Sequence, residues 1–138
     1  MPRNRDSAKR AGARFEQAVA HYLSWALNDE RIERRHLSGA KDRGDITGIL
    51  FDGHRVVIEC KDTSKLALSK HLAEAEDESA NDDATFWALV QKRRGIGIDR
   101  LSGVGQQLVI MPLEQYALML NHGLPLGPEE IDAKGTKQ

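Results

Sequence analysis

The sequence predicts a single α/β (α+β) domain in which a mixed β-sheet is flanked by helices. Three observations carry this expectation: apolar residues at helical spacing near the N-terminus, two β-like segments around a turn signal in the middle, and a strand, strand, helix order at the end. A length of 138 residues suits one domain, and no repeat or linker divides it. We therefore expect one domain over residues 1–138, with flexible tails at 1–8 and 127–138, where no apolar period is found.

The first third of the chain predicts a helix followed by a basic loop. Apolar residues recur at steps of three and four over residues 8–28, which is typical of an amphipathic helix, and Ser7 is its candidate N-cap. A short strand is expected at 32–37. Residues 38–44, Ser-Gly-Ala-Lys-Asp-Arg-Gly, then form a small loop.

The remainder alternates strands and helices around a hairpin at Asp52-Gly53, a strong turn signal. The expected elements are strands at 45–51 and 55–61, a helix at 66–80, a strand at 86–91, a basic connection at 93–106, a strand at 107–111 and a helix at 112–121. The strand at 86–91 is apolar throughout, as in the buried centre of a sheet.

The two hairpin segments divide into an apolar face and a charged face. Side chains alternate along a strand, and the even-numbered positions are nearly all apolar: Ile46, Leu50, Val56, Ile58 and Cys60. If both apolar sets face one core, even residues must lie opposite even residues. This favours a three-residue loop that pairs Leu50 with His54, or another odd-length loop or bulge, over a plain two-residue turn. Asp45 then lies opposite Glu59, with Lys61 on the same face.

Two carboxylates beside an ammonium group favour metal-assisted hydrolysis. Directly opposed like charges repel, at a cost of up to ~1 kcal/mol. Mg²⁺ or Mn²⁺ removes that cost because hard cations take carboxylate oxygens. A lysine beside the ion can hold or deprotonate an attacking water and stabilise developing charge. The alternative is a surface hairpin with a cross-strand salt bridge, which contributes little to stability.

The charges are segregated although the net charge is only −1. Lys41 and Arg43 precede Asp45, and a second basic cluster follows the strand at 86–91, at Lys92, Arg93 and Arg94. Such clusters predict contacts to a phosphate backbone, or else are ordinary solvated faces. The single cysteine excludes an intrachain disulfide and a Cys-rich zinc site. With no secretory signal and no apolar run of membrane length, the sequence suits a cytoplasmic protein.

The hairpin motif resembles a known nuclease signature. Gly44-Asp45-Ile46, followed beyond the turn by Ile58-Glu59-Cys60-Lys61, is similar to the D…E-x-K motif of the PD-(D/E)XK nuclease superfamily. With Phe15-Glu16 on the first helix and Ser38-Gly39 in the loop, the order of elements resembles small archaeal and phage Holliday junction resolvases. The resemblance covers about residues 12–91, and the basic segment 91–95 also fits phage members. Gly44 stands where the superfamily's namesake has Pro, which many members lack.

This resemblance implies a restriction-endonuclease-like core and a Mg²⁺-dependent endodeoxyribonuclease. Asp45, Glu59 and the backbone carbonyl of Cys60 are then metal ligands, Glu16 adds a ligand directly or through water, and Lys61 orients or activates water. Ser38 is expected to contact a phosphate or simply to suit its loop. The implied substrate is branched DNA, cut by a homodimer because a symmetric cut needs two sites. A repair, restriction-like or single-strand nuclease, or a non-catalytic DNA-binding phage accessory protein, remains an alternative.

Overall fold

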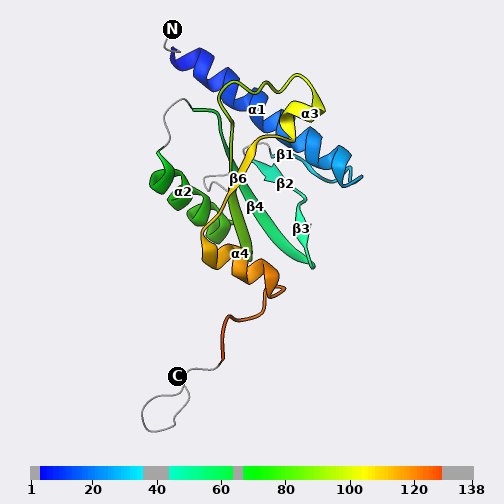
Figure 1. The fold of residues 1–138 in the computed structure, drawn as a ribbon, viewed down its shortest axis with the longest axis vertical. Coiled ribbons are helices and arrows are strands. Elements are labelled where there is room, and N and C mark those ends of the chain that lie inside the picture. The colour runs from blue at the N-terminus through cyan, green and yellow to red at the C-terminus, as the bar shows by residue number, and fades with distance from the viewer. Residues whose placement is uncertain (1–3, 36–43, 64–66, 129–138) are drawn as a thin grey trace.

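The computed structural model describes residues 4–35, 44–63 and 67–128. Its helices and strands are α1 (Arg5–Ala26), β1 (Glu33–Arg34), β2 (Ile46–Thr47), β3 (Leu50–Phe51), β4 (His54–Lys61), α2 (Leu68–Asn81), β5 (Phe86–Gln91), α3 (Leu101–Val104), β6 (Leu108–Ile110) and α4 (Leu113–Leu120). A mixed sheet lies between helices, which confirms the predicted fold class (Figure 1). No helix in the described ranges has both the length and the apolar character needed to cross a membrane.

The sheet has the strand order β1-β2-β4-β5-β6, and β3 pairs with β4 beyond β2. Among the strands of the described residues, β4 and β5 alone run parallel, and α2 connects them across one face of the sheet. Parallel neighbours require such a crossover. The C-terminal ends of β4 and β5 therefore lie side by side, with Lys61 opposite Gln91.

The two faces of β4 pack against different helices. Ile58 and Cys60 belong to a buried cluster with Phe15 and other residues of α1. Val57 belongs to a second cluster with Ala75 of α2 and Trp87. This is the period-two alternation expected of a strand covered on both sides. Odd-numbered residues of β4 thus face α2, and even-numbered ones face α1.

Helix α1 begins earlier than the sequence pattern predicts. Its N-cap is Asn4, whose Oδ1 accepts a hydrogen bond from the backbone N–H of Ser7 at 2.8 Å. Ser7 is therefore inside the helix and is not its cap, and residues 5–8 are helical where a flexible tail was expected. Asn and Ser are both good caps, and the choice between them depends on backbone geometry that the sequence does not state.

The hairpin turn differs from the prediction, and a bulge compensates for it. Leu50 pairs with Arg55 and Phe51 with His54, so Asp52-Gly53 is a two-residue turn in which both residues have positive φ. The expected Leu50–His54 pair is wrong. Further along, however, Ile46 pairs with Ile58. Four steps on one strand thus match three on the other, which places one extra residue between β2 and β3.

Gly48 makes this bulge possible. Its φ of +90° lies in a region that side-chain-bearing residues rarely adopt, and an added Cβ would collide with the backbone carbonyl of Arg31. The bulge restores the even-to-even register that the apolar pattern requires. It therefore keeps Asp45 in the position opposite Glu59.

Candidate active site

Charged side chains gather where β4 ends, on the face that α2 covers. The Nζ atom of Lys61 lies 3.1 Å from Oε1 of Glu59 and 2.8 Å from Oε2 of Glu74, which comes from α2. The Glu59 side chain is only 8% exposed, so this ion pair is largely removed from solvent. Lys61 therefore bridges two carboxylates, one from its own strand and one from the neighbouring helix.

Asp45 directly precedes β2, the strand that pairs with β4 along the edge away from β5. Its Oδ2 accepts a hydrogen bond of 2.7 Å from the backbone N–H of Cys60, and its own N–H donates to the carbonyl of Ile58 at 3.1 Å. With Ile46 opposite Ile58, Asp45 occupies the register position opposite Glu59. The structure thus joins Glu59 and Lys61 by an ion pair and places Asp45 opposite Glu59 in the register of the sheet, and a shared site of the three residues stays a prediction.

The backbone carbonyl of Cys60 is directed toward the same side as Asp45. In a parallel ladder, alternate residues turn both their N–H and C=O groups to one neighbour. The carbonyl of Lys61 accepts from the N–H of Lys92 at 3.0 Å, so Lys61 is oriented toward β5. Cys60, one residue earlier, must be oriented away from β5, and its N–H indeed meets Asp45. Its carbonyl therefore lies on the Asp45 side of β4, and its role as a metal ligand stays a prediction.

The hydrogen bonds of Lys61 fix its protonation state. Burial alone would lower the pKa of Lys61, but the hydrogen bond to Glu74 and the charge of Glu59 outweigh burial and raise the pKa above its ordinary value. The same hydrogen bond lowers the pKa of Glu74. Lys61 is therefore a cation at neutral pH, and Glu74 is its anionic partner.

Two buried oxygen atoms beside Lys61 have no hydrogen-bond partner in the described part of the chain. They are Oε2 of Glu59 and Oε1 of Gln91, the residue paired with Lys61 in the sheet. Buried polar atoms are normally satisfied, so two unsatisfied acceptors on adjoining strands need an explanation. Both are oxygens, which makes this end of the sheet rich in acceptors and suited to a hard cation.

The thiol of Cys60 reports the negative charge around it. Burial raises the pKa of Cys60, and the charges of Asp45, Glu16 and Glu59 raise it further. Cys60 is therefore a neutral, buried thiol, in keeping with its place on the apolar face. The carboxylates on both sides of β4 create a negative potential that a cation would relieve.

Glu16 is placed differently from the other three candidates. It projects from α1, on the opposite face of the sheet from Glu59, and its Oε2 pairs with Nε of Arg34 at 2.8 Å. Within residues 4–35, 44–63 and 67–128, no three His, Cys, Asp or Glu side chains form a group that could hold a metal ion. The described residues thus present a pair of carboxylates, and a ligand role for Glu16 stays a prediction.

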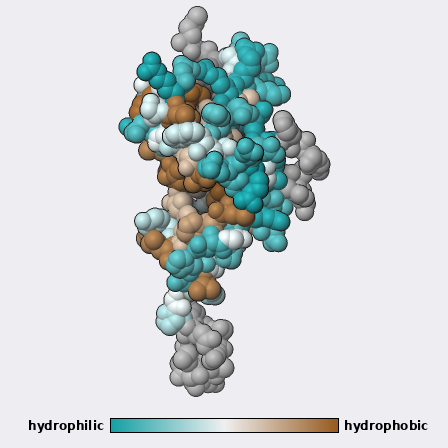
Figure 2. All heavy atoms as spheres, turned by 90° about the vertical axis from the view of Figure 1, so that its right-hand side faces the viewer, coloured by the Kyte–Doolittle hydropathy of each residue, from teal (hydrophilic) through white to brown (hydrophobic). Residues whose placement is uncertain are grey.

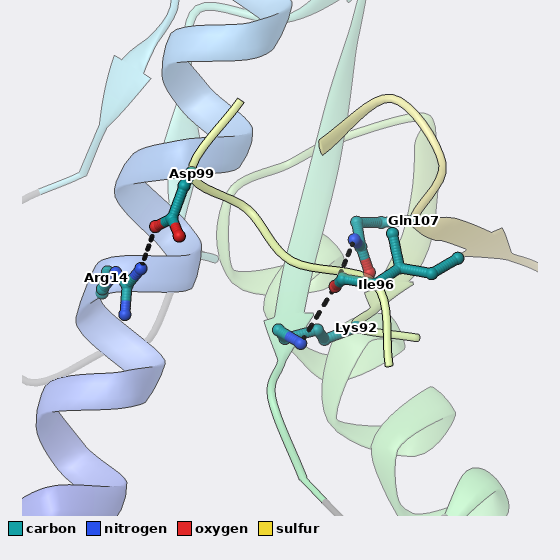
Figure 3. Close-up of polar contacts among 5 residues, drawn as sticks. All are labelled: Arg14, Lys92, Ile96, Asp99 and Gln107. Atoms are coloured by element: carbon teal, nitrogen blue, oxygen red, sulfur yellow. Dashed lines mark hydrogen bonds and ion pairs between the residues drawn. The ribbon is translucent and has the colours of Figure 1, made fainter. Parts of the chain in front are cut away.

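The second basic cluster follows β5 directly and adjoins the site. The backbone N–H of Lys92 donates a hydrogen bond to the carbonyl of Lys61. The Nζ of Lys92 donates to the carbonyl of Ile96 at 3.2 Å, and the same carbonyl accepts from Gln107 at 3.3 Å (Figure 3). Lys92 thus stabilises its own loop, whereas Arg93 and Arg94 are exposed. An ion pair between Arg14 and Asp99 holds this loop to α1. The other predicted DNA contacts, Ser38, Lys41 and Arg43, lie outside the described residues.

Two residues of the site were not found from the sequence. Glu74 and His71 lie one helical turn apart on α2, and His71 is only 7% exposed. Burial lowers the pKa of His71, and the positive charge of Lys61 lowers it further, so the ring is neutral at pH 7. The available signal was the His-x-x-Glu spacing, but nothing local indicates that this face of the helix meets Lys61.

No family model, curated protein sequence or solved structure matches this chain. The function of the protein is therefore inferred from the chemistry of the site.

Proposed function

We propose that this protein is a divalent-cation-dependent endonuclease that hydrolyses DNA phosphodiester bonds in an active site formed by Asp45, Glu59 and Lys61. One observation carries the proposal: among the described residues, a buried oxygen of Glu59 has no hydrogen-bond partner, although it lies beside a cationic lysine and next to a second carboxylate. Leaving a buried acceptor unsatisfied costs about 1–3 kcal/mol, more for a charged group. A purely structural salt bridge gives no reason for this cost.

The residues present fit Mg²⁺ or Mn²⁺. Asp45 and Glu59 would supply carboxylate oxygens, and Cys60 would supply its carbonyl, which is oriented away from β5. A divalent cation bound there supplies Lewis-acid stabilisation of phosphoryl oxygens and makes water a better nucleophile. Glu16 could join only by leaving Arg34 or by acting through water.

Lys61 acts as a proton donor or positive charge and not as the general base. Its raised pKa keeps it protonated, and a protonated amine cannot accept a proton from water. Its ammonium can hold the attacking water or stabilise negative charge on the phosphoryl group. Glu74 is not one of the two proposed carboxylate ligands. It pairs with Lys61 at 2.8 Å and so holds the ammonium group in position.

DNA is the proposed substrate, and branched DNA in particular. The exposed Arg93 and Arg94 lie in the loop that leaves the site, where a phosphate backbone could meet them. The preference for branched DNA and the action as a homodimer are proposed from the resemblance to small resolvases.

The experiment is a cleavage assay on labelled four-way junction, flap, nicked and hairpin DNAs with Mg²⁺, Mn²⁺ or EDTA. We expect wild-type cleavage with either metal, none with EDTA, and none from Glu59→Gln, which retains its fold. Glu30→Gln, at an exposed glutamate on the α1–β1 connection, is the matched control and should cut normally. DNA binding without cleavage of any substrate, with either metal, would instead identify a non-catalytic DNA-binding protein.

A further inference from the structure

A cavity of about 440 Å³ lies beside the C-terminal end of α2, far from Lys61. It is lined by residues 46–50 of β2, β3 and their connection, by Arg55 and Val56 of β4, and by Arg31, Arg35 and Asp82. Pockets that bind small molecules usually measure about 300–1,000 Å³. The cavity is therefore large enough for a small ligand, and arginine predominates among its charged residues.

Two of these arginines reach the cavity from different strands and meet at Asp82. Arg34 pairs with Glu16 of α1, so Arg35, the next residue, is directed to the α2 side of the sheet, as odd-numbered Arg55 is. Nη2 of Arg35 lies 3.0 Å from Oδ2 of Asp82, and Nη1 of Arg55 donates to the backbone carbonyl of Asp82 at 2.9 Å. Asp82 thus holds both guanidinium groups in place, which lowers the entropic cost of binding a ligand.

Capping of α2 accounts for only part of this arrangement. Positive side chains stabilise the C-terminal end of a helix, and α2 has no basic residue in its own last turn. This explains why arginines contact Asp82. It does not explain Nε of Arg35, which is buried without a hydrogen-bond partner among the described residues, a state that costs free energy.

The cavity carries an excess of positive charge. Arg31 binds Asp29 through both Nε and Nη2. Among the described residues, three guanidinium groups are thus accompanied by two carboxylates, those of Asp29 and Asp82. Arginine stays protonated throughout the physiological pH range. An anion would balance the excess and accept hydrogen bonds from arginine donors that the two carboxylates do not use.

An apolar wall adjoins the charged end of the cavity. Leu50 pairs with Arg55 across the hairpin, so both side chains lie on one face of the strands, and Leu50 is 53% exposed. Figure 2 looks onto the side of the molecule where β3 lies in Figure 1, and it shows apolar surface bordered by hydrophilic surface. Apolar walls with a few polar groups at one end are typical of sites for organic ligands.

We propose that this cavity binds a small organic phosphomonoester, with its phosphate at Arg31, Arg35 and Arg55 and its organic group against Leu50. A terminal phosphate has three acceptor oxygens and a charge of about −1.5 to −2 at neutral pH. Guanidinium groups match such oxygens in geometry and charge. A carboxylate has two oxygens and one charge, which leaves more of the arginine donors without an acceptor.

A phosphodiester of a DNA backbone fits this cavity less well. It has one charge and two free oxygens, and its chain continues on both sides, whereas the Arg35 side chain is only 23% exposed. The cavity is also distant from the proposed active site, because Arg55 and Lys61 are six residues apart on β4. At about 3.3 Å per residue this is about 20 Å. The phosphomonoester site therefore does not depend on the nuclease proposal.

The test is isothermal titration calorimetry of the full chain with phenyl phosphate, inorganic phosphate and dimethyl phosphate, in EDTA and at constant ionic strength. EDTA prevents a metal ion at Asp45 and Glu59 from binding the phosphate. We expect phenyl phosphate to bind most tightly, inorganic phosphate to bind more weakly because it lacks the organic group, and the diester to bind at least tenfold more weakly than phenyl phosphate. No binding of phenyl phosphate at millimolar concentration, or equal affinity for the diester, would overturn the proposal.

Variants locate the site. Arg31→Gln and Arg55→Gln, both at exposed positions, should keep the wild-type melting temperature and each weaken phenyl phosphate by about tenfold. Arg35→Gln should weaken it more, and if that variant fails to fold, the two exposed positions still decide. Arg10→Gln is the matched control, because it removes the same charge from an exposed position on α1, and it should bind as wild type does. Unchanged affinity in Arg31→Gln and Arg55→Gln, or an equal loss in Arg10→Gln, would overturn the proposal.

Discussion

Lys61 of β4 and Glu74 of α2 form an ion pair of 2.8 Å that connects the end of a central strand to the helix covering it. Lys61 also meets Glu59 at 3.1 Å, so its ammonium is held by two carboxylates with different surroundings. Glu59 is buried, whereas the Glu74 side chain is 34% exposed. This difference separates the proposed roles: Glu59 would bind the cation, and Glu74 would keep Lys61 in place.

Replacing Glu74 should impair catalysis more than stability. Glu74→Ala leaves Lys61 without its outer partner, and misplacement of a catalytic group by about 1 Å can reduce turnover roughly 100-fold. The pair is partly exposed, so the loss of stability should stay below about 1 kcal/mol. The turnover of Glu74→Gln, which keeps an oxygen acceptor, should lie between those of the wild type and Glu74→Ala. Glu76→Gln, at an exposed site on the same helix, should cut normally. A rise in KM with kcat unchanged would contradict the proposal that Glu74 positions Lys61.

The contribution of Glu74 to stability should depend on pH. Its pKa in the folded protein is below the ordinary value of 4.5, so its contribution is present above about pH 4.5 and is lost as the pH falls through the folded pKa. The raised pKa of Lys61 leaves the pair intact up to at least its ordinary value of 10.5. The difference in unfolding free energy between wild type and Glu74→Gln, measured by urea at neutral pH, should shrink at about pH 3. An equal difference at both pH values would show that the pair is not formed.

The bulge predicts an unequal response of two glycines. Gly48→Ala places a Cβ against the carbonyl of Arg31 and also keeps a positive φ. An unfavourable φ alone costs about 1–3 kcal/mol, so we expect this substitution to destabilise the fold by more than that. Gly53→Ala has positive φ in open space and should cost only about 1 kcal/mol. Thermal or urea unfolding measures both. If Gly48→Ala were the milder change, the register that places Asp45 opposite Glu59 would be wrong.

The exposed arginines after β5 should bind backbone phosphates. Changing Arg93 and Arg94 to Gln should weaken all DNA sequences about equally and reduce the slope of log affinity against log salt by about one per lost contact. Arg55→Gln, at the opposite end of β4, should leave the slope unchanged. Fluorescence anisotropy in EDTA measures this without cleavage. A sequence-dependent loss would indicate base contacts instead.

Local periodicity was sufficient to predict the faces of the sheet. Alternation along β4 correctly separated Ile58 and Cys60 from Glu59, because a strand covered on both sides enforces the period. It could not locate the extra residue. The two-residue turn and the bulge at Gly48 satisfy the same register as a three-residue loop, and the carbonyl of Arg31 that selects glycine there is distant in sequence.

The partners of Lys61 were beyond local patterns for a related reason. Which face of α2 meets β4 is set by packing of Ala75 against Val57, a contact between residues far apart in the chain. Glu74 and His71 are carried to the site by that packing. Local sequence does not distinguish a solvated glutamate from one that pairs with Lys61, and only the tertiary structure shows that Glu74 does so.

Removing one carboxylate of the proposed metal pair should stabilise the metal-free fold. Asp45→Asn keeps an oxygen that can accept from Cys60 but removes a charge opposite Glu59, which relieves repulsion of up to ~1 kcal/mol. We expect a higher melting temperature than wild type in EDTA. With saturating Mg²⁺ the order should reverse, because a ligand at 100 times its Kd adds about 2.7 kcal/mol to the wild type. A lower melting temperature in EDTA would mean that the two carboxylates do not repel.

Manganese binding tests most directly whether Asp45 and Glu59 share a cation. In an electron paramagnetic resonance titration of the DNA-free protein, free Mn²⁺ signal should be lost with wild type, at one ion per chain. Asp45→Asn with Glu59→Gln should leave the signal at its protein-free level, while Glu30→Gln binds as wild type does. Equal binding by wild type and the double variant would contradict the metal site and, with it, the proposed nuclease.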